Sequence, residues 1–418
     1  MRIIILTSRH PYFGHLGCGE FVLASLCKGL INSGYDVSYA FVGTNNEINK
    51  NVDIKIKELG INYLGDFSDQ LIINKPKSIF SVLLKVIKSY FNFREIEDYG
   101  FKNSHEIVSK LGNNDDLFLL FWDSYFEYIL NDIKNIKMCA FYAKSPHDSS
   151  LIDNKNKKFN NENILDYLKL NLIEFFIRRK IRNNINRMKA LNYMSNICNL
   201  DVKKFRSYGV NVEYIPLSIP DCFKDYQINQ EIKKVDYPIK IIGGLGKINA
   251  TGSRIGLNFL LKNILPTIDS KLYKNDWIMN FYGKGYAKKD INIIDSYSNL
   301  KFYGFVDDID RELIRNDIAL LFNNAGNYTG TYTRVPYLMS SGICLIAHKN
   351  LGKSVPELIN GKNIIMGETS EEISELIIET IHNEDLRRNI GNNARKTFLE
   401  YFSVEKVVEK FSQGIKNI

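Results

Sequence analysis

The segment from residue 317 to residue 348, DIALLFNNAGNYTGTYTRVPYLMSSGICLIAH, constrains the fold of this chain more than any other. Two apolar runs, at 318–322 and 343–347, predict buried strands, and a short helix is expected between them at 334–339. The loop before this helix is rich in glycine, asparagine and threonine. A helix N-terminus presents unpaired backbone N–H groups and a partial positive charge. The segment therefore predicts a strand–loop–helix–strand unit that suits a phosphate or diphosphate.

The rest of the chain shows the same alternation of strand and helix patterns in two separate runs. The first run begins with a strand at 3–7 and a loop that contains Gly17 and Gly19, and the second begins with a strand at 239–242. Between the runs, residues 217–238 are polar and charged without clear periodicity, which indicates a linker. A length of 418 residues is also too great for one typical core. We expect an α/β protein with two doubly wound, Rossmann-like domains.

Composition and charge exclude several classes of protein. Hydrophobic residues make up 44% and charged residues 24%, which is ordinary for a soluble globular chain. The net charge of +8 is spread along the chain and lacks the basic stripe of a nucleic-acid-binding protein. No apolar run approaches the roughly 20 residues that cross a bilayer, and six scattered cysteines indicate buried thiols in a reducing compartment. We expect a cytoplasmic protein that binds no nucleic acid.

Four short blocks in the second half occur in the order found in one enzyme family, namely Gly-Gly-Leu at 243–245, Tyr-Gly-Lys-Gly at 282–285, Tyr-Gly-Phe-Val-Asp at 303–307 and Ser-Ser-Gly at 340–342. With these blocks the chain resembles the retaining family 4 glycosyltransferases of the GT-B fold. The resemblance covers most of the chain and is specific in the second half. It implies two Rossmann-like domains that face each other across a cleft, with an acceptor domain at 1–220, a nucleotide-sugar donor domain at 221–400 and a last helix at 401–418 that crosses back.

The resemblance also implies which residues bind the donor. Lys247 and Arg254 match a basic pair that holds the donor diphosphate, and two solvated surface cations are the alternative. Arg334 can hold a diphosphate through its planar guanidinium group, and the hydroxyls beside it can contact phosphate or cap the helix. The remaining expected donor residues lie in loops and at the helix: Gly17, Gly19, Gly244, Gly283, Val306, Gly330, Thr331, Tyr332, Thr333 and Tyr337.

The chain departs from the family at its pair of glutamates. Counting back from Gly342, the family's ribose-binding glutamate falls at Tyr337, and the earlier glutamate falls near Thr329. The carboxylate that would hold the ribose diol is therefore missing from its usual place. Either the ribose is held in another way, or the donor pocket differs.

His147 is the predicted catalytic residue. It follows a predicted strand at 138–142, where family members often place a histidine that touches the donor sugar near its reacting carbon. A loop histidine that caps local backbone is the alternative. The resemblance implies that no metal is bound, and the absence of an Asp-x-Asp motif from a suitable loop agrees with this, since Asp307-Asp308 indicates a surface turn. No cofactor is expected, and the substrate favoured is a UDP-sugar.

Two segments, 75–94 and 175–189, combine apolar helical faces with lysine and arginine. Basic amphipathic helices of this kind can lie on anionic lipid. Alternatively, the apolar face of each helix packs on the protein core and the basic residues along its edge face solvent. Both readings stay open for each segment.

The predicted function is transfer of a sugar from a nucleotide-sugar to a saccharide or lipid-linked saccharide, with retention, in bacterial-type surface polysaccharide synthesis. The reaction would take place in the cytoplasm or at the inner face of the membrane. A catalytically inert GT-B protein that binds a sugar nucleotide or a partner is the alternative, supported by the missing glutamates. A sugar-nucleotide epimerase would need cleft carboxylates that the sequence does not identify. The first loop lacks a GxGxxG spacing, which disfavours an NAD-dependent enzyme.

Overall fold

The computed structural model describes residues 1–13, 19–43, 54, 56–73, 99–122, 129, 136–142, 164–225, 238–322, 333–416 and 418. The chain divides into two compact units. The first unit comprises Met1–Ile197, Asp201–Ile215 and Val408–Ile418, and the second comprises Cys198–Leu200 and Pro216–Val407.

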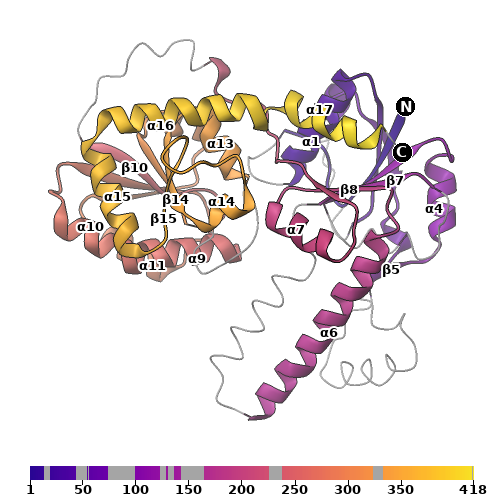
Figure 1. The fold of residues 1–418 in the computed structure, drawn as a ribbon, viewed down its shortest axis with the longest axis horizontal. Helices are drawn as coiled ribbons and strands as arrows, with labels where there is room; N and C mark the ends of the chain where they lie inside the picture. The colour runs from indigo at the N-terminus through magenta and orange to yellow at the C-terminus, as the bar shows by residue number, and fades with distance from the viewer. Residues whose placement is uncertain are drawn as a thin grey trace. The chain divides into compact units, whose positions relative to one another are not determined.

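A seven-stranded parallel sheet forms the centre of the first unit (Figure 1). Its strand order is β3-β2-β1-β6-β7-β8-β9. The strands are β1 (Arg2–Thr7), β2 (Asp36–Phe41), β3 (Asn62–Asp66), β6 (Leu117–Trp122), β7 (Met138–Tyr142), β8 (Tyr193–Asn196) and β9 (Val212–Tyr214). The inner strands β1, β6 and β7 are predominantly apolar, and all of their residues are buried except Arg2 and Trp122 at strand ends, as expected for parallel strands that are covered on both faces.

Helices and two short strands complete this unit. The helices are α1 (Gly19–Asn32), α4 (Ser104–Leu111), α6 (Ile164–Met188), most of α7 (Asn199–Ser207) and the second part of α17 (Val404–Ile415), and β4 (Leu71–Ile73) pairs with β5 (Tyr99–Phe101) in an antiparallel ribbon. Phe411 of α17 packs edge to face against Phe141 and Tyr193, with ring centroids 5.9 and 6.1 Å apart. The predicted basic segment 175–189 lies in α6 except for its last residue, Lys189, whereas the segment 75–94 lies outside the described residues.

The second unit contains a six-stranded parallel sheet of order β12-β11-β10-β13-β14-β15. Its strands are β10 (Ile239–Gly244), β11 (Trp277–Tyr282), β12 (Leu300–Gly304), β13 (Ile318–Leu321), β14 (Cys344–His348) and β15 (Ile365–Gly367). The chain starts at β10, moves outward to β12 and then returns to the other side of β10, so the strand order reverses between β10 and β13. Ligands of such sheets bind beyond the carboxyl ends of the strands at this reversal.

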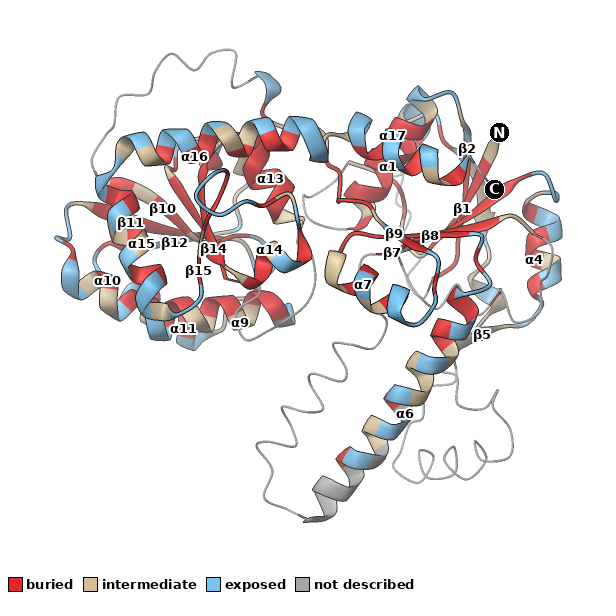
Figure 2. Cartoon of the chain, viewed as in Figure 1, coloured by how far each residue is buried: buried red, intermediate tan, exposed pale blue. Residues whose placement is uncertain are grey.

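Helices cover both faces of the second sheet (Figure 1). One face carries α9 (Thr251–Phe259), α10 (Leu265–Lys271) and α11 (Lys288–Asp295), and the other carries α13 (Arg334–Ser341) and α16 (Glu384–Thr397). The remaining helices are α12 (Ile309–Leu313), α14 (Asn350–Ser354) and α15 (Ser370–His382), with π-helical turns at Leu260–Ile264 and Phe398–Phe402. Figure 2 shows burial concentrated along the strands and on the helix faces toward them.

Local chemistry sets where these helices begin and end. Asn383 precedes α16, and its side chain accepts a hydrogen bond from the backbone N–H of Leu386. Helix α13 ends at Gly342, which has a left-handed φ of 71°, and β14 follows. The short helix and second strand predicted from the segment 317–348 are therefore present. The two parallel sheets confirm the prediction of two doubly wound, Rossmann-like α/β domains.

Candidate functional site

Two glycine-containing loops pack against each other at the carboxyl edge of the second sheet. One follows β10 and contains Gly246, and the other follows β11 and contains Gly283 and Lys284. The backbone N–H of Lys284 donates to the carbonyl of Gly246 at 3.1 Å. Gly283 has a φ of 115°, and a Cβ placed on it would lie 2.0 Å from the carbonyl oxygen of Gly246. Glycine is therefore required at position 283, because any side chain would separate the loops.

Basic side chains surround these paired loops. The backbones of Lys247 and Lys284 form a short parallel bridge between the loops, and the Nζ of Lys284 lies over the ring of Phe305, 4.0 Å from its centroid. The guanidinium group of Arg334, in the first turn of α13, reaches back to this place: its Nη2 donates to Ser253 Oγ at 2.5 Å, and its Nε lies 3.8 Å from a Cβ built on Gly246. The structure thus brings the predicted residues Lys247, Gly283 and Arg334 together, next to Gly244 at the end of β10.

Arg254 is held differently from the other cations. It forms an ion pair with Asp290, whose side chain is almost completely buried, and its Nη2 donates to the carbonyl of Gly285 at 2.9 Å. Lys247, by contrast, is exposed and forms no ion pair with any residue that the structure describes. The predicted basic pair therefore has unequal members, because the charge of Arg254 already has a partner within the protein.

Tyr337 lies one helical turn after Arg334 and is only 5% exposed. Its hydroxyl donates a hydrogen bond to a carboxylate oxygen of Asp310, in the first turn of α12. Burial raises the pKa of Asp310 above its usual value, and the hydrogen bond from Tyr337 opposes that rise. A carboxylate is therefore present beside the position where sequence analysis found none. The sequence signal that could have revealed it was the run Asp307-Asp308-Ile309-Asp310, interpreted as a surface turn.

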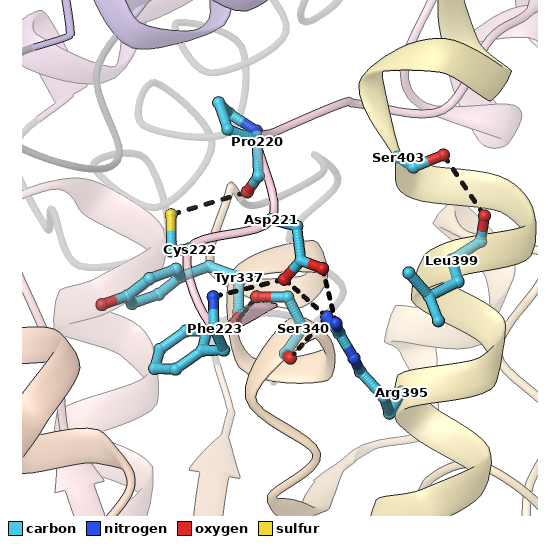
Figure 3. A network of polar contacts seen from close by, with 9 residues as sticks. All are labelled: Pro220, Asp221, Cys222, Phe223, Tyr337, Ser340, Arg395, Leu399 and Ser403. Atoms are coloured by element: carbon cyan, nitrogen blue, oxygen red, sulfur yellow. Dashed lines mark hydrogen bonds and ion pairs between the residues drawn. The ribbon is translucent and has the colours of Figure 1, made fainter. Parts of the chain in front are cut away.

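A polar network fixes the other end of α13 (Figure 3). Asp221 receives hydrogen bonds from both terminal nitrogens of Arg395, at 2.6 and 2.5 Å. Arg395 also donates to the carbonyl of Ser340 at 2.9 Å, near the last turn of α13. Phe223 follows on the same segment, and its ring lies 5.5 Å from that of Tyr337. The segment around Asp221 therefore packs against the helix that carries Arg334 and Tyr337.

The remaining predicted residues fall into two groups. Gly19, Val306 and Thr333 are described: Gly19 begins α1 in the first unit, Val306 lies half-buried between β12 and α12, and Thr333 directly precedes α13 without a side-chain hydrogen bond that caps it. The others lie outside the described residues: Gly17, His147, Gly330, Thr331 and Tyr332.

Solved structures share the fold of this protein over nearly the whole chain. TarM, known from S. aureus, matches with a TM-score of 0.65 and 13% identity over 99% of this chain and 98% of that chain. HepE from Anabaena, in complex with UDP and glucose, matches with a TM-score of 0.59 and 11% identity over 100% of both chains. The chain has the GT-B fold. WaaG, a glycosyltransferase involved in lipopolysaccharide biosynthesis, has the same fold with a TM-score of 0.55, 11% identity and full coverage of both chains.

At these identities the likeness of the GT-B structures concerns the fold alone. No protein-family model matches the sequence, and no curated protein matches it. Among the helices that the structure describes, none combines the length and apolarity needed to cross a membrane.

Proposed function

We propose that this GT-B protein is a glycosyltransferase that moves a sugar from a nucleoside-diphosphate sugar to a saccharide or lipid-linked saccharide. The observation that carries the proposal is that the paired loops beside the strand-order reversal of the second sheet carry Lys247 and Lys284, and that the guanidinium group of Arg334 lies against them. A ligand with two adjacent phosphates suits such a site, because it matches several cations and the N-terminus of α13 at once.

The chemistry of transfer explains why cations are useful there. When the bond between the anomeric carbon and the donor phosphate breaks, negative charge builds on the departing diphosphate. The oxygen of an acceptor hydroxyl then forms the new bond to that carbon, and its proton passes to the departing diphosphate. Fixed positive groups next to the diphosphate stabilise the charge as it develops, by several kcal/mol where donors are well placed. Arg334 and Lys247 are the residues to which we assign this task, and no metal ion is needed for it.

The solved neighbours support the choice of donor and acceptor classes. HepE has been solved with UDP and glucose, and a TarM mutant has been solved with UDP, alpha-GlcNAc-glycerol and fondaparinux. We therefore favour a UDP-sugar as the donor and a saccharide as the acceptor, with retention at the anomeric carbon and a role in surface polysaccharide synthesis. His147 is the residue we assign to contact the donor sugar.

A position at the inner face of the cytoplasmic membrane is part of this proposal. On α6, Phe175, Arg178 and Arg182 are exposed at three- and four-residue spacings and so share one side of the helix. No acidic residue occurs between 175 and 189, and Glu174, just before this segment, forms an ion pair with Arg178 at 2.7 Å. An apolar ring beside several cations suits the surface of an anionic bilayer.

The missing glutamates favour a second candidate, a GT-B protein that binds a sugar nucleotide without turning it over. Tyr337 and Thr329 stand where the family has carboxylates, and the charge of Arg254 has a partner in Asp290. An inert protein of this kind would bind nucleoside diphosphates as tightly as a transferase does, but it would not cleave the sugar nucleotide.

One experiment separates the two candidates. Binding of UDP, ADP and GDP is measured by calorimetry, and the matching sugar nucleotides are then incubated with the protein to follow release of the nucleoside diphosphate. A transferase releases it slowly by hydrolysis even without an acceptor, and an Arg334→Ala variant should do so at least tenfold more slowly. Arg388→Ala, on the exposed side of α16, is the matched control. Binding without release would favour the inert protein, and an absence of binding by all three nucleotides would contradict both.

A further inference from the structure

The contact between Tyr337 and Asp310 joins two elements that both leave the carboxyl edge of the second sheet. Asp310 follows β12 and Tyr337 follows β13, and 27 positions separate them in the sequence. The ring of Tyr337 is buried against Phe223, so its hydroxyl requires an acceptor, and Asp310 Oδ1 is that acceptor. This contact therefore fixes the orientation of one carboxylate at the ligand-binding edge.

Asp310 keeps the capacity to accept further hydrogen bonds. Tyr337 is the one side chain in the described parts of the chain that donates to it, and no described lysine, arginine or histidine forms an ion pair with it. The residue is half-buried, and its second oxygen is not among the buried polar atoms that lack a partner. That oxygen is accordingly accessible. An ionised carboxylate offers about four lone-pair sites, of which Tyr337 uses one.

The spacing of Arg334 and Tyr337 on α13 suits the build of a nucleotide. Tyr337 lies three residues after Arg334 on α13, which corresponds to about 4.5 Å along the axis and to the same side of the helix. In a nucleoside diphosphate the ribose joins the first phosphate through a single CH₂–O linkage. A ribose therefore reaches the next turn of the helix when its diphosphate lies against the first. Vicinal hydroxyls are good donors to a carboxylate, and Rossmann-like nucleotide sites use acidic residues in this way.

We propose that Asp310, held in place by Tyr337, accepts the hydrogen bonds of the donor's ribose hydroxyls and replaces the carboxylate that α13 lacks. The inference rests on the proposed function, since it concerns the same nucleotide. Tyr337 is a positioning residue here: its hydroxyl orients one oxygen of Asp310 and leaves the other for the ligand. Phe223 holds the ring of Tyr337, which links the ribose subsite to the segment around Asp221 shown in Figure 3.

The test compares a nucleotide with its deoxy forms in three proteins. Whichever of UDP, ADP or GDP binds most tightly is measured by calorimetry beside its 2′-deoxy and 3′-deoxy analogues. In the wild type, loss of one ribose hydroxyl should weaken binding about tenfold. In Asp310→Asn the natural nucleotide should bind about tenfold more weakly, and the deoxy analogues should bind as well as it does. Tyr337→Phe should reduce the discrimination only in part. Asp307→Asn, on the exposed neighbouring turn, should keep it in full.

The ribose subsite is supported if the natural and deoxy nucleotides have equal dissociation constants in Asp310→Asn but different ones in the wild type and in Asp307→Asn. A general loss of structure would weaken the binding of all these ligands equally and would leave their ratio unchanged. A ratio that stays at the wild-type value in Asp310→Asn overturns the inference while leaving the proposed function intact. Absence of binding by any of the three nucleotides to the wild type removes the proposed function and this inference together. Thermal melting of each variant verifies that the fold is retained.

Discussion

Arg254 and Asp290 form an ion pair that ties the first turn of α9 to the first turn of α11. Asp290 also accepts a hydrogen bond from the backbone N–H of Ala287 at 3.0 Å, which holds the start of α11. Arg254 adds a contact to the loop after β11 through the carbonyl of Gly285. A cation expected on the donor diphosphate therefore serves first to hold the two helices that support the phosphate-binding loops.

Removal of Arg254 should consequently affect stability more than it affects binding. Arg254→Ala leaves the buried Asp290 carboxylate without its partner, and we expect a loss of at least about 2 kcal/mol in unfolding free energy. Chemical denaturation measures this change. The double variant Arg254→Ala with Asp290→Ala should recover part of the loss, since it leaves no unpaired charge. A destabilisation that the second substitution deepens would contradict this role of the pair.

Removal of Arg334 should affect binding more than it affects stability. Its Nη2 donates to Ser253 Oγ, and its Nε lies 3.8 Å from a Cβ built on Gly246, so its guanidinium group lies at the paired loops. We expect Arg334→Ala to weaken nucleoside-diphosphate binding by at least about 1.5 kcal/mol, the scale of a hydrogen bond to a charged group. Inorganic pyrophosphate, which has no ribose or base, should lose affinity to the same extent. Unchanged calorimetric affinity for both ligands would remove Arg334 from the site.

Gly283 and Gly361 provide a matched pair for testing the packed loops. Both have positive φ, at 115° and 72°, but a Cβ on Gly361 meets nothing within 4 Å. Gly361→Ala should cost about 1 to 2 kcal/mol for its backbone conformation alone. Gly283→Ala should cost more and should also weaken diphosphate binding, because it forces apart the loops that carry Lys247 and Lys284. Equal melting temperatures for the two variants would show that the loops are not constrained as described.

His147 remains the predicted contact to the donor sugar. It follows β7 in the sequence, in a stretch rich in small and polar residues, so its truncation should open no core cavity. We expect His147→Ala to change stability by less than about 1 kcal/mol and to lower turnover about a hundredfold or more. Melting temperature and sugar transfer are both measured. Full activity in a folded variant would exclude the role, and an unfolded variant would indicate a structural histidine.

The raised pKa of Asp310 predicts a pH-dependent stability difference. Its folded pKa lies above the value of the unfolded chain, so the stability that this group contributes is fully present below the unfolded pKa and is lost as pH rises through the folded pKa. Asp310→Asn removes the cost of burying the charge and should melt at or above the wild-type temperature near pH 7. The difference between the two proteins should shrink as the pH falls toward about 4. A variant that melts well below the wild type at pH 7 would contradict this.

Much of the architecture followed from hydrophobic pattern, because fully buried parallel strands appear as unbroken apolar runs. The segment 317–348 is the clearest case, since its strand, helix and terminal Gly342 all occur as predicted. The contacts of the segment 217–238 could not be predicted in this way. Its polarity indicated a linker, yet Asp221 pairs with Arg395 and Phe223 packs on Tyr337. Residues so far apart in the sequence come into contact only in the folded chain. The identity of one charged residue does not show whether its side chain will face water or pair with another side chain.

Some residues of the candidate site could likewise be predicted from the sequence, and others could not. Glycines and cations that follow predicted strands could be expected to lie together, because the carboxyl ends of parallel strands meet at one edge of the sheet. The role of Asp310 could not, since it depends on which residue of α12 faces which residue of α13. For the same reason the ion pair between Arg254 and Asp290 could not be predicted from the sequence.

The division of α17 has a consequence for the order in which the chain folds during translation. Residues of this helix up to Val407 belong to the second unit, and those from Val408 belong to the first, where Phe411 packs on Phe141 and Tyr193. The six strands of the second unit are all synthesised before that point. The seven strands of the first unit's parallel sheet are also complete earlier, at Tyr214, so the part of that unit which is synthesised last is residues 408–415, and the packing of Phe411 on Phe141 and Tyr193 can form only after both sheets have been translated.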